Sequence, residues 1–254
     1  MTCVQTHPIA LLDEPPTHLL QGGSLLLDFD GTLVEIAERP DAVVVSAALR
    51  DLVVALHDRL DGRVAVISGR PAREVQALLG CPVHVVGSHG LEFAWTDRAV
   101  EMAPRPDGLT HVLAAMRDFA AAQPGLLVED KPLGAALHFR GAPQMADASI
   151  ALVQRLANQH DLKLQAGKMM IEARVGGGDK GSAIRRIMLE PGFAGTRPLF
   201  LGDDVTDEPG FAMAAELGGA GVLVGDVRES AACYRLKDVT AVRSWLAQAM
   251  EGLE

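Results

Sequence analysis

The sequence contains few cysteines and few aromatic residues. Three of its 254 residues are cysteine, and Phe, Trp and Tyr together make up 4% of the chain. Cys3, Cys81 and Cys233 are far apart, so they do not have the spacing of a zinc site or a redox pair. An odd, scattered set of cysteines favours a reducing compartment.

Long apolar runs and an excess of basic residues are also missing. No apolar run approaches the length of a membrane-spanning helix, and the N-terminus has no basic region followed by an apolar stretch. The formal net charge is −10 at pH 7, which disfavours nucleic acid as a partner. We therefore expect a cytoplasmic protein that binds neither nucleic acid nor membranes, and that is a monomer or a weak oligomer.

The most informative stretch runs from Ser24 to Leu33. A short apolar run preceded by two glycines leads directly to two carboxylates, Asp28 and Asp30. Such a run predicts a parallel strand that is buried on both faces, with the carboxylates at its C-terminal end, where α/β sheets bind ligands. Two acids so close repel each other unless a cation holds them or one stays protonated. The alternative is an ordinary turn, since Asp and Gly are common in turns.

Three regions follow from the pattern of apolar residues. Strands of four or five apolar residues alternate with amphipathic helices over 23–103 and again over 176–254, which predicts a doubly wound α/β core with a parallel sheet. Residues 104–175 instead show helix, two strands, helix, two strands, so we expect an inserted α+β module between Pro104 and the glycines at 176–178. Residues 1–22 predict a loose leader with one helical turn.

Further polar groups follow other predicted strands, namely Ser68, then Ser88 and His89, then Asp203 and Asp204. Strand ends of a parallel sheet converge on one crevice. The second acidic segment, 203–208, brings four more carboxylates toward Asp28 and Asp30, and these need a hard cation. Oxygen ligands without His or Cys favour Mg²⁺ over zinc. A solvated acidic loop is the alternative for this segment taken alone.

Four motifs, in this order along the chain, resemble those of the haloacid dehalogenase superfamily: Asp28-Phe29-Asp30-Gly31-Thr32-Leu33, Ser68-Gly69-Arg70, Lys180 and Gly202-Asp203-Asp204. Three stretches narrow the resemblance to the trehalose-6-phosphate phosphatase family: Ser68-Gly69-Arg70, residues 87–92 and residues 202–208. Four charged segments of the inserted module agree with this family: Glu129-Asp130-Lys131, His138-Phe139-Arg140, Gly167-Lys168 and Ile171-Glu172.

The resemblance implies a Mg²⁺-dependent hydrolysis of trehalose 6-phosphate through an aspartyl-phosphate. In the family's pattern Asp28 matches the nucleophile and Asp30 the general acid and base, while Ser68 and Lys180 match residues that contact the phosphate. The Mg²⁺ ligands match the Asp28 carboxylate, the Asp30 backbone carbonyl and the Asp203 carboxylate, with Asp204 and Asp207 nearby. Substrate-binding positions match Arg70, His89, Glu129, Lys131, Arg140, Lys168 and Glu172. The inserted module would act as a cap that closes over the site.

Strand periodicity supports part of this assignment without the family. Residues two apart in a strand share a face, so one sheet face of the module is expected to be charged and the other apolar. The charged face would hold Glu129 with Lys131, His138 with Arg140, and Lys168 with Glu172. The apolar face would hold Leu137, Phe139, Met169 and Ile171. A solvent-facing surface of mixed charge is the alternative.

Three other functions remain open from the sequence. The same chemistry could act on another sugar phosphate, such as sucrose phosphate or glucosyl- or mannosyl-glycerate phosphate. A non-catalytic sugar-phosphate sensor is a rival of another class, although an intact Asp28 and Asp30 pair argues against it. A phosphomutase is the third alternative, and net phosphate release would exclude it.

Overall fold

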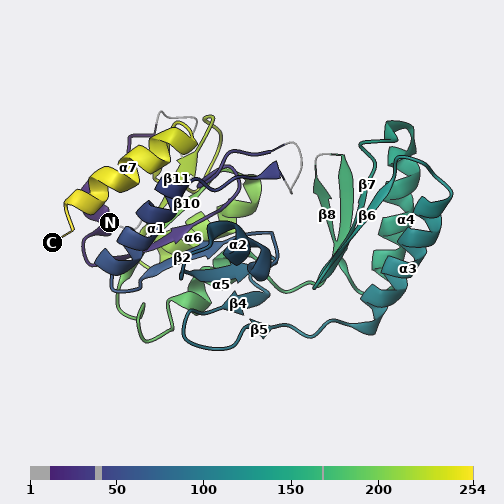
Figure 1. The fold of residues 1–254 in the computed structure, drawn as a ribbon, viewed down its shortest axis with the longest axis horizontal. Coiled ribbons are helices and arrows are strands. Elements are labelled where there is room, and N and C mark those ends of the chain that lie inside the picture. The colour runs from purple at the N-terminus through teal and green to yellow at the C-terminus, as the bar shows by residue number, and fades with distance from the viewer. Residues whose placement is uncertain (1–11, 38–41, 168, 254) are drawn as a thin grey trace. The chain divides into compact units, whose positions relative to one another are not determined.

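The structure is a computed structural model that describes residues 12–37, 42–167 and 169–253. The chain divides into two compact units (Figure 1). The first, here called the core unit, comprises the described residues up to Glu101 together with those from Gly178 onward. The second, here called the inserted unit, is Met102–Gly177. Among the described residues, no helix combines the length and the apolar character needed to cross a membrane.

The core unit contains an eight-stranded sheet in the order β12-β11-β10-β1-β2-β3-β4-β5. Pairing is parallel from β12 to β3, and β4 runs antiparallel to β3. The strands are β1 (Gly23–Leu27), β2 (Val64–Ile67), β3 (His84–Gly87), β4 (Glu92–Ala94), β5 (Glu101–Met102), β10 (Arg197–Gly202), β11 (Ala220–Val224) and β12 (Tyr234–Leu236). The chain proceeds from β1 to one side of the sheet and later to the other, so the strand order switches at β1, where α/β sheets bind ligands.

Helices cover both faces of this sheet because its strands are apolar on both faces. Leu25 and Leu27 of β1 pack into one cluster, and Leu26 between them packs into the other, as the alternation of a strand requires. The first cluster includes side chains of α1 (Ala47–Arg59), α2 (Ala72–Leu79) and α7 (Val239–Glu251), and Figure 1 shows α1 beside α7. The second includes side chains of α5 (Lys180–Ile187) and α6 (Glu208–Glu216).

Part of the expected leader packs against the core unit. Residues Thr17–Leu20 form the short 3-10 helix η1, and the Leu20 side chain is fully buried. The indole Nε1 of Trp245 donates to the carbonyl of Pro15 at 2.5 Å. The single helical turn is therefore present, but the segment from Pro15 to Leu20 is not loose.

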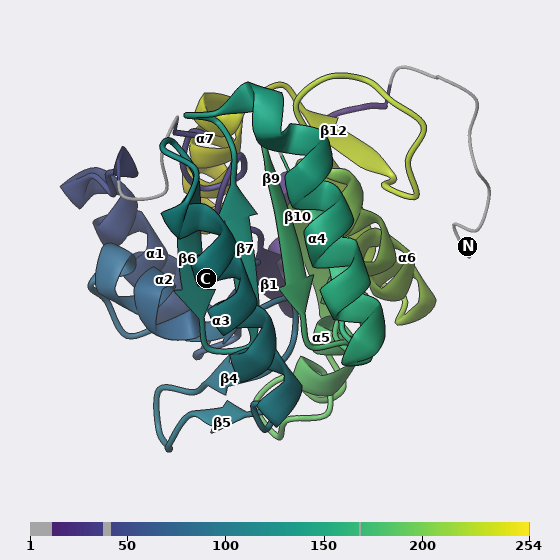
Figure 2. The same cartoon turned by 90° about the vertical axis from the view of Figure 1, so that its right-hand side faces the viewer.

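The inserted unit is a four-stranded antiparallel sheet with two helices on one face. The strand order is β6-β7-β9-β8. Its elements are α3 (Asp107–Ala121), β6 (Leu127–Lys131), β7 (Gly134–His138), η3 (Pro143–Met145), α4 (Ala146–Gln159), β8 (Lys163–Gly167) and β9 (Met170–Arg174). Figure 2 shows α3 and α4 side by side on the sheet, and their apolar side chains form one cluster with Leu137 and Ile171.

Candidate active site

Asp28 lies immediately after the central strand β1, at the edge of the sheet where ligands bind. Its backbone N–H donates to the carbonyl of Leu201 at 2.9 Å, which continues the pairing of β1 with β10. The side chain is only 4% exposed. Lys180 Nζ donates to Asp28 Oδ1 at 2.5 Å. Asp28 is thus a buried carboxylate held next to a buried cation.

Lys180 joins two carboxylates from different parts of the chain. It is the first residue of α5, and its Nζ also donates to Asp207 Oδ1 at 2.5 Å. Burial alone would lower the pKa of Lys180, but the negative charges of Asp28 and Asp207 outweigh burial and raise it. Lys180 therefore stays charged, which explains how a lysine is stable at a helix N-terminus, where the helix dipole disfavours a cation.

Asp207 is also bound through its second oxygen. The backbone N–H of Asp204 donates to Asp207 Oδ2 at 2.8 Å, and the Asp207 side chain is fully buried. A Cβ at Gly202 would lie 2.3 Å from the Asp207 carboxyl carbon, so glycine is needed for this approach. Asp207 therefore fixes both Lys180 and the loop that follows β10.

Asp203 lies near Asp28 and has a carboxylate oxygen that accepts no hydrogen bond. Its Oδ1 atom is buried without a hydrogen-bond partner. Burial, followed by the charge of Asp207, raises the pKa of Asp203 to about 6. Burial also raises the pKa of Asp28 well above its usual value, against the opposing effect of Lys180. Gly31 leaves room for Asp203, because a Cβ there would lie 2.1 Å from Asp203 Oδ2.

These carboxylates have the arrangement of a divalent-cation site. Ligand oxygens of Asp28, Asp203 and Asp207 all lie within 4.8 Å of one another. A bound cation would give the buried Asp203 oxygen a partner, and its positive charge would lower the raised pKa values of the carboxylates. An all-oxygen donor set fits Mg²⁺. Because Asp207 uses both of its oxygens elsewhere, Asp28 and Asp203 are the side chains best placed to hold the ion.

Asp30 is bound by Arg70 through both of its oxygens. Arg70 Nε donates to Asp30 Oδ2 at 2.6 Å and Arg70 Nη2 donates to Asp30 Oδ1 at 2.8 Å. Arg70 also donates to Glu74, in the first turn of α2. The sequence placed Arg70 among substrate-binding residues, but in this structure it contacts two carboxylates of the core unit.

Ser68 and His89 lie in two neighbouring loops that follow β2 and β3. Ser68 is 1% exposed, and its Oγ accepts from the backbone N–H of Arg70 at 3.1 Å. The backbone N–H of His89 donates to the Ser68 carbonyl at 3.0 Å. A Cβ at Gly69 would lie 2.7 Å from the His89 ring. The two loops are therefore in direct contact.

Asp204 is not part of the carboxylate cluster. Its side chain is exposed and accepts from the backbone N–H of Val205 at 2.7 Å, at the start of the 3-10 helix η4 (Val205–Asp207). The structure thus gives Asp204 a capping contact rather than a place beside Asp28.

The charged face of the inserted unit contains two ion pairs. Lys131 Nζ lies 2.7 Å from Glu172 Oε2, and His138 Nε2 lies 2.9 Å from Glu129 Oε2. Glu172 is only 5% exposed. Gly134 makes space for it, since a Cβ there would lie 2.4 Å from Glu172 Oε1. The four charged residues share the sheet face opposite the helices.

The structure describes only one of the other two expected residues of this unit. Arg140 is exposed and lies in a turn beyond the end of β7. Lys168 lies outside the described residues. The sequence pattern puts Lys168 and Glu172 on one strand, whereas β9, which carries Glu172, begins only at Met170.

Comparisons with known proteins agree with this geometry. Residues 26–240 match the family model described as Trehalose-phosphatase. The chain is 38% identical over 231 residues to the trehalose-6-phosphate phosphatase of Escherichia coli, covering 89% of this chain and 86% of that protein. It is 34% identical over 236 residues to a probable trehalose-phosphate phosphatase of Sinorhizobium fredii, covering 90% and 88%.

The chain belongs to the trehalose-phosphatase family. Its fold is that of the C-terminal domain of the C. albicans trehalose-6-phosphate phosphatase, with a TM-score of 0.79 at 23% identity over 96% of this chain and 99% of that one. The expected haloacid dehalogenase-like fold, a parallel sheet core with a second α/β unit, is confirmed. Family membership makes the chain a phosphomonoester hydrolase, as the resemblance implies.

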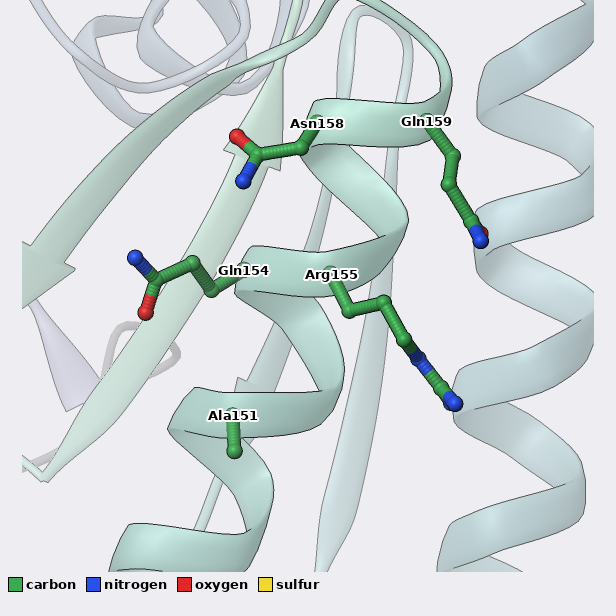
Figure 3. Close-up of a pocket in the computed structure, with 5 residues that line it drawn as sticks. All are labelled: Ala151, Gln154, Arg155, Asn158 and Gln159. Atoms are coloured by element: carbon green, nitrogen blue, oxygen red, sulfur yellow. The ribbon is translucent and has the colours of Figure 1, made fainter.

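A hollow of about 490 Å³ on the inserted unit is not a candidate active site of this phosphatase. It is lined by Ala151, Gln154, Arg155, Asn158 and Gln159, all on α4 (Figure 3). Figure 3 shows Gln154 and Asn158 pointing to one side of the helix and Arg155 and Gln159 to the other. These side chains include no nucleophile and no carboxylate, thiol or imidazole that would hold a metal.

The sequence missed the partners that hold the catalytic loops in place. Glu74 contacts Arg70 at i,i+4 spacing, which a search for helical ion pairs would have found. Glu92 contacts Ser88, four residues earlier, and the start of α2, 20 residues earlier, and no local pattern signals the second contact.

Proposed function

We propose that this protein hydrolyses trehalose 6-phosphate to trehalose and phosphate in a Mg²⁺-dependent reaction. The observation that supports this most strongly is a cluster of three buried residues, Asp28, Lys180 and Asp207, with the half-buried Asp203, whose buried Oδ1 atom has no partner. The names of the E. coli and S. fredii relatives support the substrate.

The reaction has two steps, both at the phosphate. An Asp28 oxygen forms a bond to phosphorus while the bond from phosphorus to the sugar oxygen breaks, which gives an aspartyl-phosphate. Asp30 donates a proton to the departing sugar oxygen. A water molecule then attacks the aspartyl-phosphate, gives a proton to Asp30 and restores Asp28. Protons and phosphate balance, because Asp30 ends as it began.

The surrounding residues stabilise charge in both steps. Lys180 is positioned to offset the negative charge of the phosphate as well as that of Asp28, and its raised pKa keeps it protonated. Ser68 is proposed to donate to a phosphoryl oxygen. Mg²⁺, held by the carboxylates of Asp28 and Asp203, would supply further positive charge to the phosphate.

Recognition of the sugar is assigned to the inserted unit, on its charged sheet face. Lys131 and His138 supply hydrogen-bond donors there, and Glu129 and Glu172 supply acceptors. The hydroxyl groups of a disaccharide need donors as well as acceptors. Arg140 and Lys168 remain proposals on the family resemblance alone. His89 remains a proposed substrate contact in the core unit.

The test is phosphate release from a panel of sugar phosphates with and without a chelator. Trehalose 6-phosphate should have the highest kcat/KM, ahead of sucrose phosphate and glucosyl-glycerate phosphate. A chelator should abolish turnover and Mg²⁺ should restore it, whereas Ca²⁺ should not, because it prefers more ligands and a looser geometry. Full activity in excess chelator would disprove the metal requirement, and a higher kcat/KM on another sugar phosphate would disprove the substrate.

A further inference from the structure

Glu92 is a buried carboxylate to which the proposed reaction assigns no role. It is the first residue of β4 and is 2% exposed. One oxygen, Oε2, accepts from the backbone N–H of Ala72 at 3.1 Å, and the other accepts from the hydroxyl of Ser88. Burying a carboxylate costs free energy unless hydrogen bonds or ion pairs compensate it, and these two hydrogen bonds do so for Glu92.

The first contact caps helix α2 from a distant part of the chain. Ala72 is the first residue of α2, and the preceding Pro71 gives no side-chain cap. Glu92 therefore provides the acceptor, and its charge opposes the positive end of the helix dipole. This helix directly follows the segment Ser68–Arg70, so the cap also fixes where that segment ends.

The second contact holds a turn with an uncommon backbone conformation. Ser88, His89 and Gly90 have consecutive φ values of 48°, 55° and 97°. Residues other than glycine rarely adopt positive φ, and the surrounding contacts must hold them there. The hydrogen bond from the Ser88 hydroxyl to Glu92 is one such contact.

The turn is bonded directly to the segment that carries Ser68 and Arg70. The backbone N–H of Ser88 donates to the Arg70 carbonyl at 2.9 Å, and that of His89 donates to the Ser68 carbonyl at 3.0 Å. The backbones on either side are also closely packed: Gly87 directly precedes the turn, and a Cβ there would lie 2.2 Å from the backbone nitrogen of Ala72. A shift of the turn must therefore shift Ser68 and Arg70.

We propose that Glu92 is a positioning residue for the reaction: by binding Ala72 and Ser88 together it fixes the backbone of Ser68–Arg70. Ser68 is the proposed donor to the phosphate, and Arg70 holds Asp30. The inference rests on the proposed phosphatase chemistry but not on the identity of the sugar. Its effect is therefore expected on every phosphomonoester, unlike the effects of residues in the inserted unit.

The experiment measures kcat/KM on trehalose 6-phosphate and on an aryl phosphate, together with urea unfolding, for four variants. These are Glu92→Ala, Glu92→Gln, Ser88→Ala and the control Asp238→Ala. Asp238 caps α7 with a contact of the same kind, to the backbone N–H of Ala241 at 2.8 Å. The control therefore removes a carboxylate cap without touching the segment Ser68–Arg70.

Glu92→Ala should lower kcat/KM roughly 10- to 100-fold on both substrates, because displacements of about 1 Å in an active site have effects of this size. Glu92→Gln should stay within roughly threefold of the natural protein, since its amide can accept from Ala72 and donate to Ser88 Oγ. Asp238→Ala should lose stability but keep its activity.

Two results would overturn the proposal. One is a folded Glu92→Ala variant with full activity. The other is an Asp238→Ala variant that loses as much activity, for the same loss of stability, as Glu92→Ala does. If Glu92→Ala does not fold, Ser88→Ala decides, because it removes one arm only: reduced kcat/KM supports the proposal and unchanged kcat/KM contradicts it. If the natural protein does not act on trehalose 6-phosphate, the proposed substrate is wrong, and the aryl phosphate still tests Glu92.

Discussion

Arg70 binds Asp30 through two parallel hydrogen bonds, Nε to Oδ2 at 2.6 Å and Nη2 to Oδ1 at 2.8 Å. Paired contacts of this kind fix the plane of the carboxylate as well as its position. In the proposed reaction, Asp30 must leave this pair, at least in part, to protonate a departing sugar oxygen. Arg70 is therefore in a position to set the orientation of the acid before the substrate binds.

The first prediction separates this role from phosphate binding. Arg70→Ala should lower kcat/KM for trehalose 6-phosphate by ~10-fold or more but have less effect on an aryl phosphate, whose leaving group needs little protonation. Asp30→Asn should show the same preference with a larger loss, about 10²- to 10⁴-fold. The double variant should be no worse than Asp30→Asn. Equal losses on both substrates for Arg70→Ala would show instead that Arg70 binds the phosphate.

The second prediction concerns the buried charges around Lys180. Lys180→Met should abolish phosphate release and destabilise the protein by about 3–5 kcal/mol, because it leaves Asp28 and Asp207 buried without their cation. The measurement is urea unfolding alongside activity. The control is Arg185→Ala, on the same helix α5 as Lys180, which breaks an exposed ion pair with Glu216 of α6. It should change stability by less than about 1 kcal/mol. Equal stability losses in the two variants would contradict the prediction.

The third prediction concerns pH and metal binding at Asp203. Its pKa is raised by burial from 3.8 to about 6, so the metal-free folded state binds this proton more tightly than the unfolded state. The free energy of unfolding of the metal-free protein should therefore fall as the pH rises from about 4 through 6. Mg²⁺ should restore stability at neutral pH and raise Tm.

Asp203→Asn tests both parts of that prediction. In chelator at pH 7 it should raise the free energy of unfolding by about 1–2 kcal/mol, less than the full pKa shift implies because solvent screens the site. It should also remove most of the rise in Tm on adding Mg²⁺, and phosphate release should be lost. An unchanged Mg²⁺ response would place the ion away from Asp203.

The sequence predicted the parts of the site that depend on strand order. The apolar run before Asp28 and the one before Asp203 form adjacent parallel strands, so their carboxylates meet, as strand ends in a parallel sheet do. Lys180 was identified by the family motif. Each of these signals is local, a short apolar run or a short motif, and therefore visible in one sequence.

Contacts between distant loops could not be predicted in the same way. Glu92 caps a helix that begins 20 residues earlier, and no spacing rule covers such a contact. Met169, expected on the apolar face of a strand, instead has a φ of 62° and precedes β9, and its side chain does not signal this conformation. Trp245 binding the Pro15 carbonyl likewise orders a segment that has no apolar periodicity of its own.

The last prediction concerns the charged face of the inserted unit. Glu172 is nearly buried and paired with Lys131, while the core residues Asp28, Lys180 and Asp203 are expected to contact only phosphate and metal. Those core groups would act on almost any phosphomonoester, so discrimination must come from residues that contact the sugar. Binding energy gained on the remote sugar can be used to orient the phosphate.

Glu172→Ala should therefore lower kcat/KM for trehalose 6-phosphate, by about 100-fold for a buried charged hydrogen bond, and leave an aryl phosphate almost unchanged. Asp130→Ala is a matched control, because Asp130 lies in β6 but faces the helices, where it pairs with Arg105 and Arg117. It should have little effect on either substrate. A parallel fall on both substrates for Glu172→Ala would assign the residue to folding, because only recognition of the sugar can separate the two substrates. No fall on either substrate would make this face an ordinary solvated surface, and the trehalose assignment would then rest on family membership alone.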